Sequence, residues 1–249
     1  MSRTSVALND DIWIKFLASV VAGLREAARK IGSEELRPHY EARRGWFGRV
    51  RKDQGGSRIP KEEAISQALV EVLKRMRSEQ LVEGHFRDSI DLTRMEFNVE
   101  TPRRVEEGIG SQALPTDIMI GVIQDEIDLR IEAKNVIRGS EIDREYLGPR
   151  GLGRFEDLRS PYTMERFGGM LAYVMDEDVV TWQARIHQAI RAAQPPLTIL
   201  STTVAGESLI TTSHDREVDN PLHGIRQRCR TDVIHLVLEF EADPSLRGR

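Results

Sequence analysis

The feature that most constrains the fold is a pair of apolar, β-branched runs, residues 115–123 and 127–136, separated by a short polar break. Two such runs on either side of a polar break predict a β-hairpin. If the turn centres on residues 124 and 125, Asp117 and Glu132 are equally far from it and lie opposite each other. The hairpin is therefore expected to bring two carboxylates together on adjacent strands.

Lys134 shares a strand face with Glu132, because side chains alternate between the two faces of a strand. Charged groups in strands this apolar are costly to bury unless they are paired or bound to a metal. Mg²⁺ prefers carboxylate and carbonyl oxygens and keeps waters that can attack a phosphate. The pattern favours a divalent-ion site. In such a site Lys134 orients or helps to deprotonate the attacking water, or neutralises charge that builds on the phosphate.

Lys134 is distinctive because it is the only lysine after residue 75, where arginine carries every other basic position. Arginine cannot replace a compact, deprotonatable amine. The alternative interpretation is an edge hairpin that carries a solvated cluster of Asp, Glu and Lys side chains, with no chemical role.

These residues resemble the PD-(D/E)XK nuclease superfamily, as a divergent bacterial member with a restriction-endonuclease-like core. The motif consists of Asp117, then Glu132-Ala133-Lys134, with an upstream helix that carries Glu62 and Glu63. Thr116 rather than a proline precedes Asp117, and Pro115 stands one place earlier. The resemblance covers about residues 60–140. It implies an α/β core and hydrolysis of phosphodiester bonds that depends on Mg²⁺, with Mn²⁺ as an alternative.

The resemblance also implies that the metal is bound by Asp117, Glu132, the carbonyl of Ala133 and an acid from the upstream helix. Residues 61–77 are predicted to form that helix, with Pro60 before it. At 100° per residue, Glu62 falls on the apolar stripe of this helix and Glu63 falls on the opposite face. We therefore expect Glu62 to be the third acid, although a carboxylate there can also simply stabilise the helix N-terminus.

The other predicted elements are helices over residues 8–31, 162–175 and 178–193, and strands within residues 86–99 and over 197–204 and 233–242. Residues 138–161 show no clear periodicity. His214 and His235 are 21 residues apart, and they are expected to approach each other in a structural or substrate-positioning role rather than as metal ligands.

The net charge of −4 means that nucleic-acid binding would need a local basic patch. Residues 37–58 contain seven Lys/Arg and two acids, a balance of 7 − 2 = +5, together with Trp46 and Phe47. Such a segment can grip phosphates and stack on bases, or it can be a solvated connector. A Gly-rich stretch, residues 148–154, adds two arginines. The expected nucleic-acid contacts are Arg43, Arg44, Arg49, Arg51, Lys52, Arg150 and Arg154.

The expected fold is α/β (or α+β), with a central mixed sheet flanked by helices. The expected organisation is an N-terminal helix and basic loop (1–59), a nuclease core (60–242) and a tail (243–249). No apolar run reaches the roughly 20 residues of a membrane span. One cysteine fits a reducing compartment, so a cytoplasmic protein is expected.

The expected function is a metal-dependent endonuclease in restriction, phage defence or repair, with DNA favoured over RNA as its substrate. A partner subunit that selects the target, or a homo-oligomer, is compatible with this function. The alternatives are a non-catalytic subunit of the same fold that binds nucleic acid or a partner protein, and a protein-interaction module.

Overall fold

The protein was analysed as a computed structural model, which describes residues 3–48, 58–83, 91–102, 115–122, 127–156, 162–163, 165–175, 178–204, 206–220 and 225–241. Its centre is a seven-stranded mixed sheet with the order β1-β2-β3-β4-β7-β6-β5. The strands are β1 (Met95–Pro102), β2 (Pro115–Val122), β3 (Asp128–Val136), β4 (Phe167–Met175), β5 (Thr198–Val204), β6 (Glu207–Asn220) and β7 (Ile225–Phe240).

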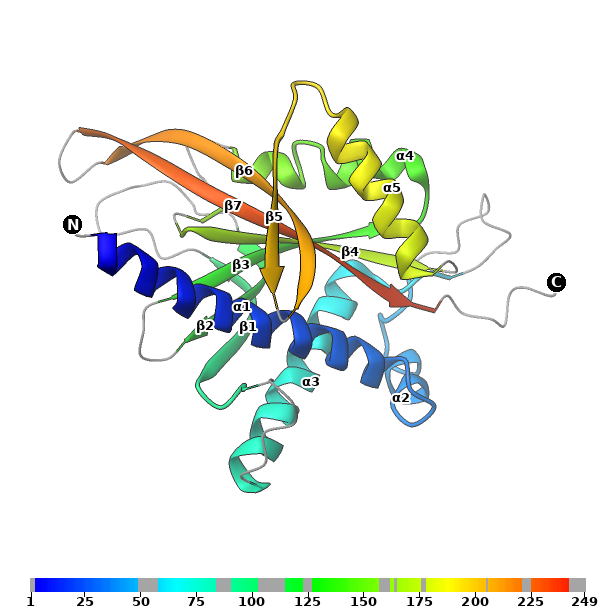
Figure 1. Ribbon diagram of the computed structural model, residues 1–249. Helices are drawn as coiled ribbons and strands as arrows, with labels where there is room; N and C mark the ends of the chain where they lie inside the picture. The colour runs from blue at the N-terminus through cyan, green and yellow to red at the C-terminus, as the bar shows by residue number, and fades with distance from the viewer. Residues whose placement is uncertain are drawn as a thin grey trace.

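Strand directions divide the sheet into three parts. β1, β2 and β3 form an antiparallel meander. β4 lies parallel to both of its neighbours, β3 and β7. β5, β6 and β7 are again antiparallel. The two parallel pairings require crossover connections, and these carry the helices that cover one face of the sheet (Figure 1).

Two long helices cover the first face, which we call the α1–α3 face. They are α1 (Arg3–Ile31) and α3 (Glu62–Glu83), with the short α2 (Arg37–Glu41) between them in sequence. Figure 1 shows α1 running across the sheet and α3 crossing near it. Buried side chains such as Leu17 and Leu24 of α1, and Leu69 and Leu73 of α3, share one apolar core with Ile131 of β3.

The opposite face, which we call the α5 face, has its own apolar core. It is covered by α5 (Val179–Ala192) and by three short helical pieces in the connection between β3 and β4. These pieces are α4 (Gly139–Glu141), η2 (Ile142–Tyr146) and η3 (Leu152–Phe155). Val136 of β3 and Met170 of β4 belong to this core, and so do Trp182 and Ile186 of α5.

The predicted hairpin is confirmed as β2 and β3, which pair antiparallel with Ile118 opposite Ile131. This is the predicted register, because the facing residue numbers sum to 249 in each pair, as they do for the predicted pair Asp117 and Glu132. Pairing with β3 runs only from Ile118 to Gly121, whereas pairing with β1 continues to Pro115. β2 and β3 therefore separate at the Asp117 end of β2.

The prediction of a helix over residues 162–175 is wrong, because residues 167–175 form β4. All nine residues of this strand are buried. A strand buried on both faces is apolar at every position, so it lacks the alternation that distinguishes a strand from a buried helix. Gly168 allows Phe155 to pack directly against the backbone of β4, since a Cβ at this position would lie 2.4 Å from Cε1 of Phe155.

Other elements differ from the prediction mainly in their ends. α1 begins earlier than predicted, α3 extends to Glu83, and the last strand begins at Ile225. β6 was not predicted, and it contains the segment around His214. Residues 138–161, which showed no periodicity, contain α4, η2 and η3. Predictions for residues 49–57, 84–90, 103–114 and 242–249 lie outside the described part of the chain.

The fold is thus α+β, with a mixed sheet flanked by helices and a long helix at the N-terminal end. Across the described residues, the helices are all too short or too polar to cross a membrane.

Candidate functional site

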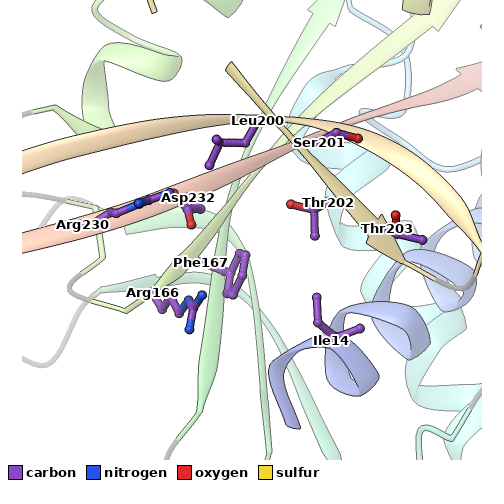
Figure 2. Close-up of a pocket in the computed structure, with 9 residues that line it drawn as sticks. All are labelled: Ile14, Arg166, Phe167, Leu200, Ser201, Thr202, Thr203, Arg230 and Asp232. Atoms are coloured by element: carbon purple, nitrogen blue, oxygen red, sulfur yellow. The ribbon is translucent and has the colours of Figure 1, made fainter. Parts of the chain in front are cut away.

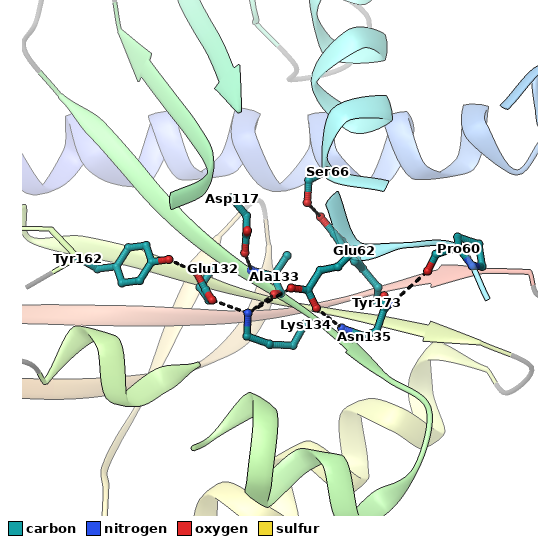
Figure 3. A network of polar contacts seen from close by, with 10 residues as sticks. All are labelled: Pro60, Glu62, Ser66, Asp117, Glu132, Ala133, Lys134, Asn135, Tyr162 and Tyr173. Carbon is teal, nitrogen blue, oxygen red and sulfur yellow. Dashed lines mark hydrogen bonds and ion pairs between the residues drawn. The ribbon is translucent and has the colours of Figure 1, made fainter. Parts of the chain in front are cut away.

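Four charged side chains converge where β2 and β3 separate (Figure 3). Asp117 comes from β2, Glu132 and Lys134 from β3, and Glu62 from the first turn of α3. The structure therefore brings together all four residues that the sequence predicted for the catalytic site. Glu63, the rejected candidate for the third acid, is exposed.

The cluster forms at an unpaired edge of β3. Beyond Ile131, the backbone N–H groups on this edge no longer meet β2. The N–H of Ala133 instead donates to Oδ2 of Asp117 (2.8 Å), and the N–H of Asn135 donates to Oε2 of Glu62 (2.9 Å). Two of the three acids thus replace the missing backbone acceptors of the sheet.

Lys134 lies at the centre of the cluster. Its ammonium donates to Glu132, to the carbonyl oxygen of Ala133 (2.9 Å) and to Oε1 of Glu62 (3.2 Å). Only 12% of the side chain is exposed. Burial by itself lowers the pKa of Lys134, but the three neighbouring carboxylates raise it above its usual value. Lys134 is therefore held as a cation.

Glu132 is the most perturbed acid of the cluster. Burial, followed by repulsion from Asp117, raises the pKa of Glu132 to about 7, although Lys134 and Tyr162 oppose the shift. Burial also raises the pKa of Glu62. One ammonium therefore does not balance three acids in a partly buried space, and the cluster retains affinity for a further cation or proton.

The donor chemistry of the cluster fits Mg²⁺. Carboxylate oxygens of Asp117, Glu132 and Glu62 and the carbonyl oxygen of Ala133 are all hard ligands of the kind this ion prefers. Within the described residues, however, no group of three or more acidic, histidine or cysteine side chains is arranged to hold a metal ion. In the present arrangement the Lys134 ammonium donates hydrogen bonds to Glu132, Ala133 and Glu62, which are three of these four possible ligands.

Tyr162 is part of the site, although the sequence did not predict it. Its hydroxyl donates to Oε2 of Glu132, and its side chain is buried. Burial, and then the charge of Glu132, raises the pKa of Tyr162 well above its usual value, so the hydroxyl remains a donor. No spacing signal could have revealed this contact, because Tyr162 lies 30 residues from Glu132 in the chain.

Of the predicted nucleic-acid contacts that the structure describes, Arg154 lies beside Tyr162, which contacts Glu132. Its guanidinium lies 5.7 Å from the ring centre of Tyr162, whereas Arg150 is exposed. The Gly-rich segment around them is a close-packed turn, because a Cβ at Gly148 or Gly151 would lie about 2 Å from a backbone oxygen. These glycines are therefore explained by packing, and no phosphate-binding role is needed to account for them.

The basic loop was predicted either to grip phosphates and stack on bases or to be a solvated connector, and its described part argues against stacking by Trp46. Trp46 is buried against Tyr40, with ring centres 5.4 Å apart, so it is not available to stack on bases. Arg43 is paired with Glu71 at 2.6 Å. Arg44 is exposed. Arg49, Arg51 and Lys52 lie outside the described residues.

His214 and His235 approach each other as expected, and both contact the hydroxyl of Thr212, at 2.8 and 3.0 Å. His235 also contacts the hydroxyl of Tyr146 (3.0 Å), and His214 contacts Glu156 (3.0 Å). Burial lowers the pKa of His235 to about 3, so this histidine is neutral. The arrangement is a satisfied hydrogen-bonded chain in the core and fits a structural role.

A separate pocket of about 390 Å³ lies on the α1–α3 face (Figure 2). Ile14 of α1 and Thr202 of β5 line it, together with Arg166, Arg230 and Asp232. Arg230 is already paired with Asp232, with 3.0 Å between Nε and Oδ1. None of the four charged residues of the cluster lines this pocket.

Comparison of the chain with protein-family models, with curated proteins and with solved structures found no match.

Proposed function

We propose that this chain is a metal-dependent nuclease that hydrolyses phosphodiester bonds, with DNA favoured over RNA as its substrate. One observation carries the proposal. Carboxylates from α3, β2 and β3 meet a mostly buried lysine beyond Ile131, where the pairing of β3 with β2 ends among the described residues. The resemblance of Asp117 and Glu132-Ala133-Lys134 to PD-(D/E)XK nucleases, with a restriction-endonuclease-like core, agrees with this arrangement.

The chemical roles follow from the donor atoms. Asp117, Glu132, Glu62 and the carbonyl of Ala133 would hold Mg²⁺, or Mn²⁺ as an alternative. The bound ion supplies Lewis-acid activation of the phosphate and of the attacking water. Lys134 is held as a cation, which favours charge neutralisation and orientation of the water over proton abstraction. Ion binding to these oxygens requires the Lys134 ammonium to leave some of its present partners.

The nucleic acid is proposed to approach the cluster beside the connection between β3 and β4. Arg154 lies on that side, with its guanidinium over the ring of Tyr162. A role in restriction, phage defence or repair, a cytoplasmic location, and a partner subunit or second copy that selects the target all belong to the same proposal.

Cleavage assays test the proposal directly. Plasmid, linear and single-stranded DNA and RNA would be incubated with Mg²⁺, with Mn²⁺ and with EDTA. Wild type would be compared with Asp117→Asn and Lys134→Met, and with the exposed lysine variant Lys61→Met as a matched control. We expect metal-dependent cutting that Asp117→Asn and Lys134→Met reduce by at least about 100-fold, in line with the loss of a preorganised charged group.

One observation favours a second function, that of a non-catalytic subunit. Asp117 and Glu62 each accept a backbone N–H of β3, and Lys134 joins Glu62 to Glu132. A purely structural role is therefore also possible for these four residues, as a clamp that holds α3 and β2 against the part of β3 that is not paired with β2. Calorimetry with Mn²⁺ distinguishes the two functions. Binding that Asp117→Asn abolishes supports the nuclease, and no binding to wild type supports the clamp.

A further inference from the structure

The acids of the cluster are anchored in two different ways. Asp117 and Glu62 each accept a backbone N–H, which fixes their orientation to β3. Among the described residues, the carboxylate of Glu132 has no such backbone anchor. Its two oxygens bond to side chains, Oε1 to Lys134 and Oε2 to Tyr162. The orientation of Glu132 therefore depends on what holds its Oε2.

Tyr162 is itself held firmly by the connection between β3 and β4. Its ring stacks on Phe155, with centres 5.5 Å apart and planes inclined by 27°. Phe155 is fully buried and lies against the bare backbone of Gly168. The backbone N–H of Tyr162 also donates to the carbonyl of Arg154 (3.4 Å). Tyr162 can therefore impose a position on Glu132 rather than follow it.

The hydrogen bond from Tyr162 occupies one oxygen of Glu132 and leaves the other oxygen facing the cluster. Tyr162 donates to Oε2, while Oε1 faces the Lys134 ammonium beside Ala133 and Glu62. A carboxylate held in this way presents one oxygen to a cation and keeps the other turned away. Without the hydroxyl, the carboxylate can rotate about its last torsion, which is broad and soft.

We propose that Tyr162 is a positioning residue that holds Glu132 so that one carboxylate oxygen is directed at the proposed metal site. This inference rests on the proposed function and assigns to it a residue outside the Asp, Glu and Lys motif. Partners of metal ligands orient those ligands, and their removal typically weakens metal affinity by about 10- to 100-fold.

The test uses Tyr162→Phe, which removes the hydroxyl and keeps the ring that stacks on Phe155. The matched control is Tyr146→Phe, another buried tyrosine of the same connection, whose hydroxyl contacts Met170 and His235 instead of an acid. Mn²⁺ binding to the metal-stripped protein would be measured by calorimetry. We expect Tyr162→Phe to weaken binding by about 10- to 100-fold and Tyr146→Phe to change it by less than about 2-fold.

A second measurement separates positioning from a general loosening of the fold. In the Glu132→Gln background, Tyr162→Phe should produce no further loss of Mn²⁺ affinity, because the partner that it orients is already changed. An equal loss in both backgrounds would overturn the inference. So would equal affinities of Tyr162→Phe and wild type, or a Tyr162→Phe chain that fails to fold, since its hydroxyl would then serve the fold. Wild-type protein that binds no Mn²⁺ would overturn the proposed function itself.

Discussion

At the scale of single residues, Glu132 combines deep burial with a like-charged neighbour, Asp117. Its pKa is raised to about 7 from an ordinary value of 4.5, first by burial and then by Asp117. The folded protein therefore holds this proton more tightly than the unfolded chain. The resulting stabilisation is fully present below about pH 4.5 and is lost as the pH rises through about 7.

This linkage predicts how the stability of Glu132→Gln compares with that of wild type. Between pH 4.5 and 7, the free energy of unfolding of metal-free wild type should fall relative to the variant by about 3 kcal/mol. Urea unfolding at several pH values measures the difference. Glu63→Gln is the control, because Glu63 is exposed and should leave the wild-type profile unchanged. Parallel profiles for wild type and Glu132→Gln would contradict the prediction.

At the scale of elements, the first turn of α3 is tied to the end of β3. Glu62 accepts the N–H of Asn135, and the side chain of Asn135 donates to the carbonyl of Pro60 (3.0 Å). These two bonds fix where α3 starts relative to the sheet. The position of the third acid is therefore a property of the junction between helix and strand.

Glu62→Ala is predicted to destabilise the protein by about 1–3 kcal/mol, because it leaves the Asn135 N–H and the Lys134 ammonium without this partner. Glu63→Ala is the natural control. Both acids lie in the first helical turn and interact similarly with the helix dipole. The difference between the stabilities of the two variants therefore measures the contribution of the contacts between α3 and β3. Chemical denaturation of both variants gives the comparison, and equal losses would rule the junction out as the cause.

The packing of β4 against the preceding connection gives a second prediction at this scale. A Cβ at Gly168 would lie 2.4 Å from the buried ring of Phe155, so Gly168→Ala should cost about 1–3 kcal/mol of stability. Gly139→Ala, where a Cβ meets no atom within 4 Å, should be close to neutral. Thermal melts of the two variants test this difference. A neutral Gly168→Ala would mean that Phe155 has room to move.

At the scale of the whole molecule, α1 belongs to the same core as α3 and the sheet. Trp13, Leu17 and Leu24 of α1 are buried within it, and Trp13 packs against Phe167 of β4, with ring centres 5.3 Å apart. Removal of α1 would expose this apolar surface of the sheet.

We therefore expect residues 60–249 alone not to fold cooperatively, although the sequence predicted a domain boundary at residue 59. Expression of this fragment, followed by a thermal melt monitored by circular dichroism, measures the outcome. A sharp melt close to that of the full chain would show that the core is autonomous and that α1 only covers it.

The sequence could predict that these four charged residues meet, because the signals that place them are local. The register of Asp117 and Glu132 follows from the midpoint of one hairpin, and the choice of Glu62 over Glu63 follows from one helical stripe. Features that depend on tertiary packing could not be predicted from the sequence. β4 is apolar at every position and so resembles a helix, and Trp46 looked available for base stacking although Tyr40 covers it. The contact of Tyr162 with Glu132 exists only after the connection has folded back on β3.

The connection between β3 and β4 also has a consequence for how such a protein can diversify. The sheet and α3 hold Asp117, Lys134 and Glu62, whereas Tyr162, which contacts Glu132, and Arg154, which lies over the ring of Tyr162, both come from this single stretch, residues 137–166. The part of the chain that holds three of the charged residues is thus separate from the part that orients Glu132 through Tyr162. Insertions or substitutions in about thirty codons can change the orientation and the pKa of Glu132, while the strands that carry the charged cluster stay unchanged.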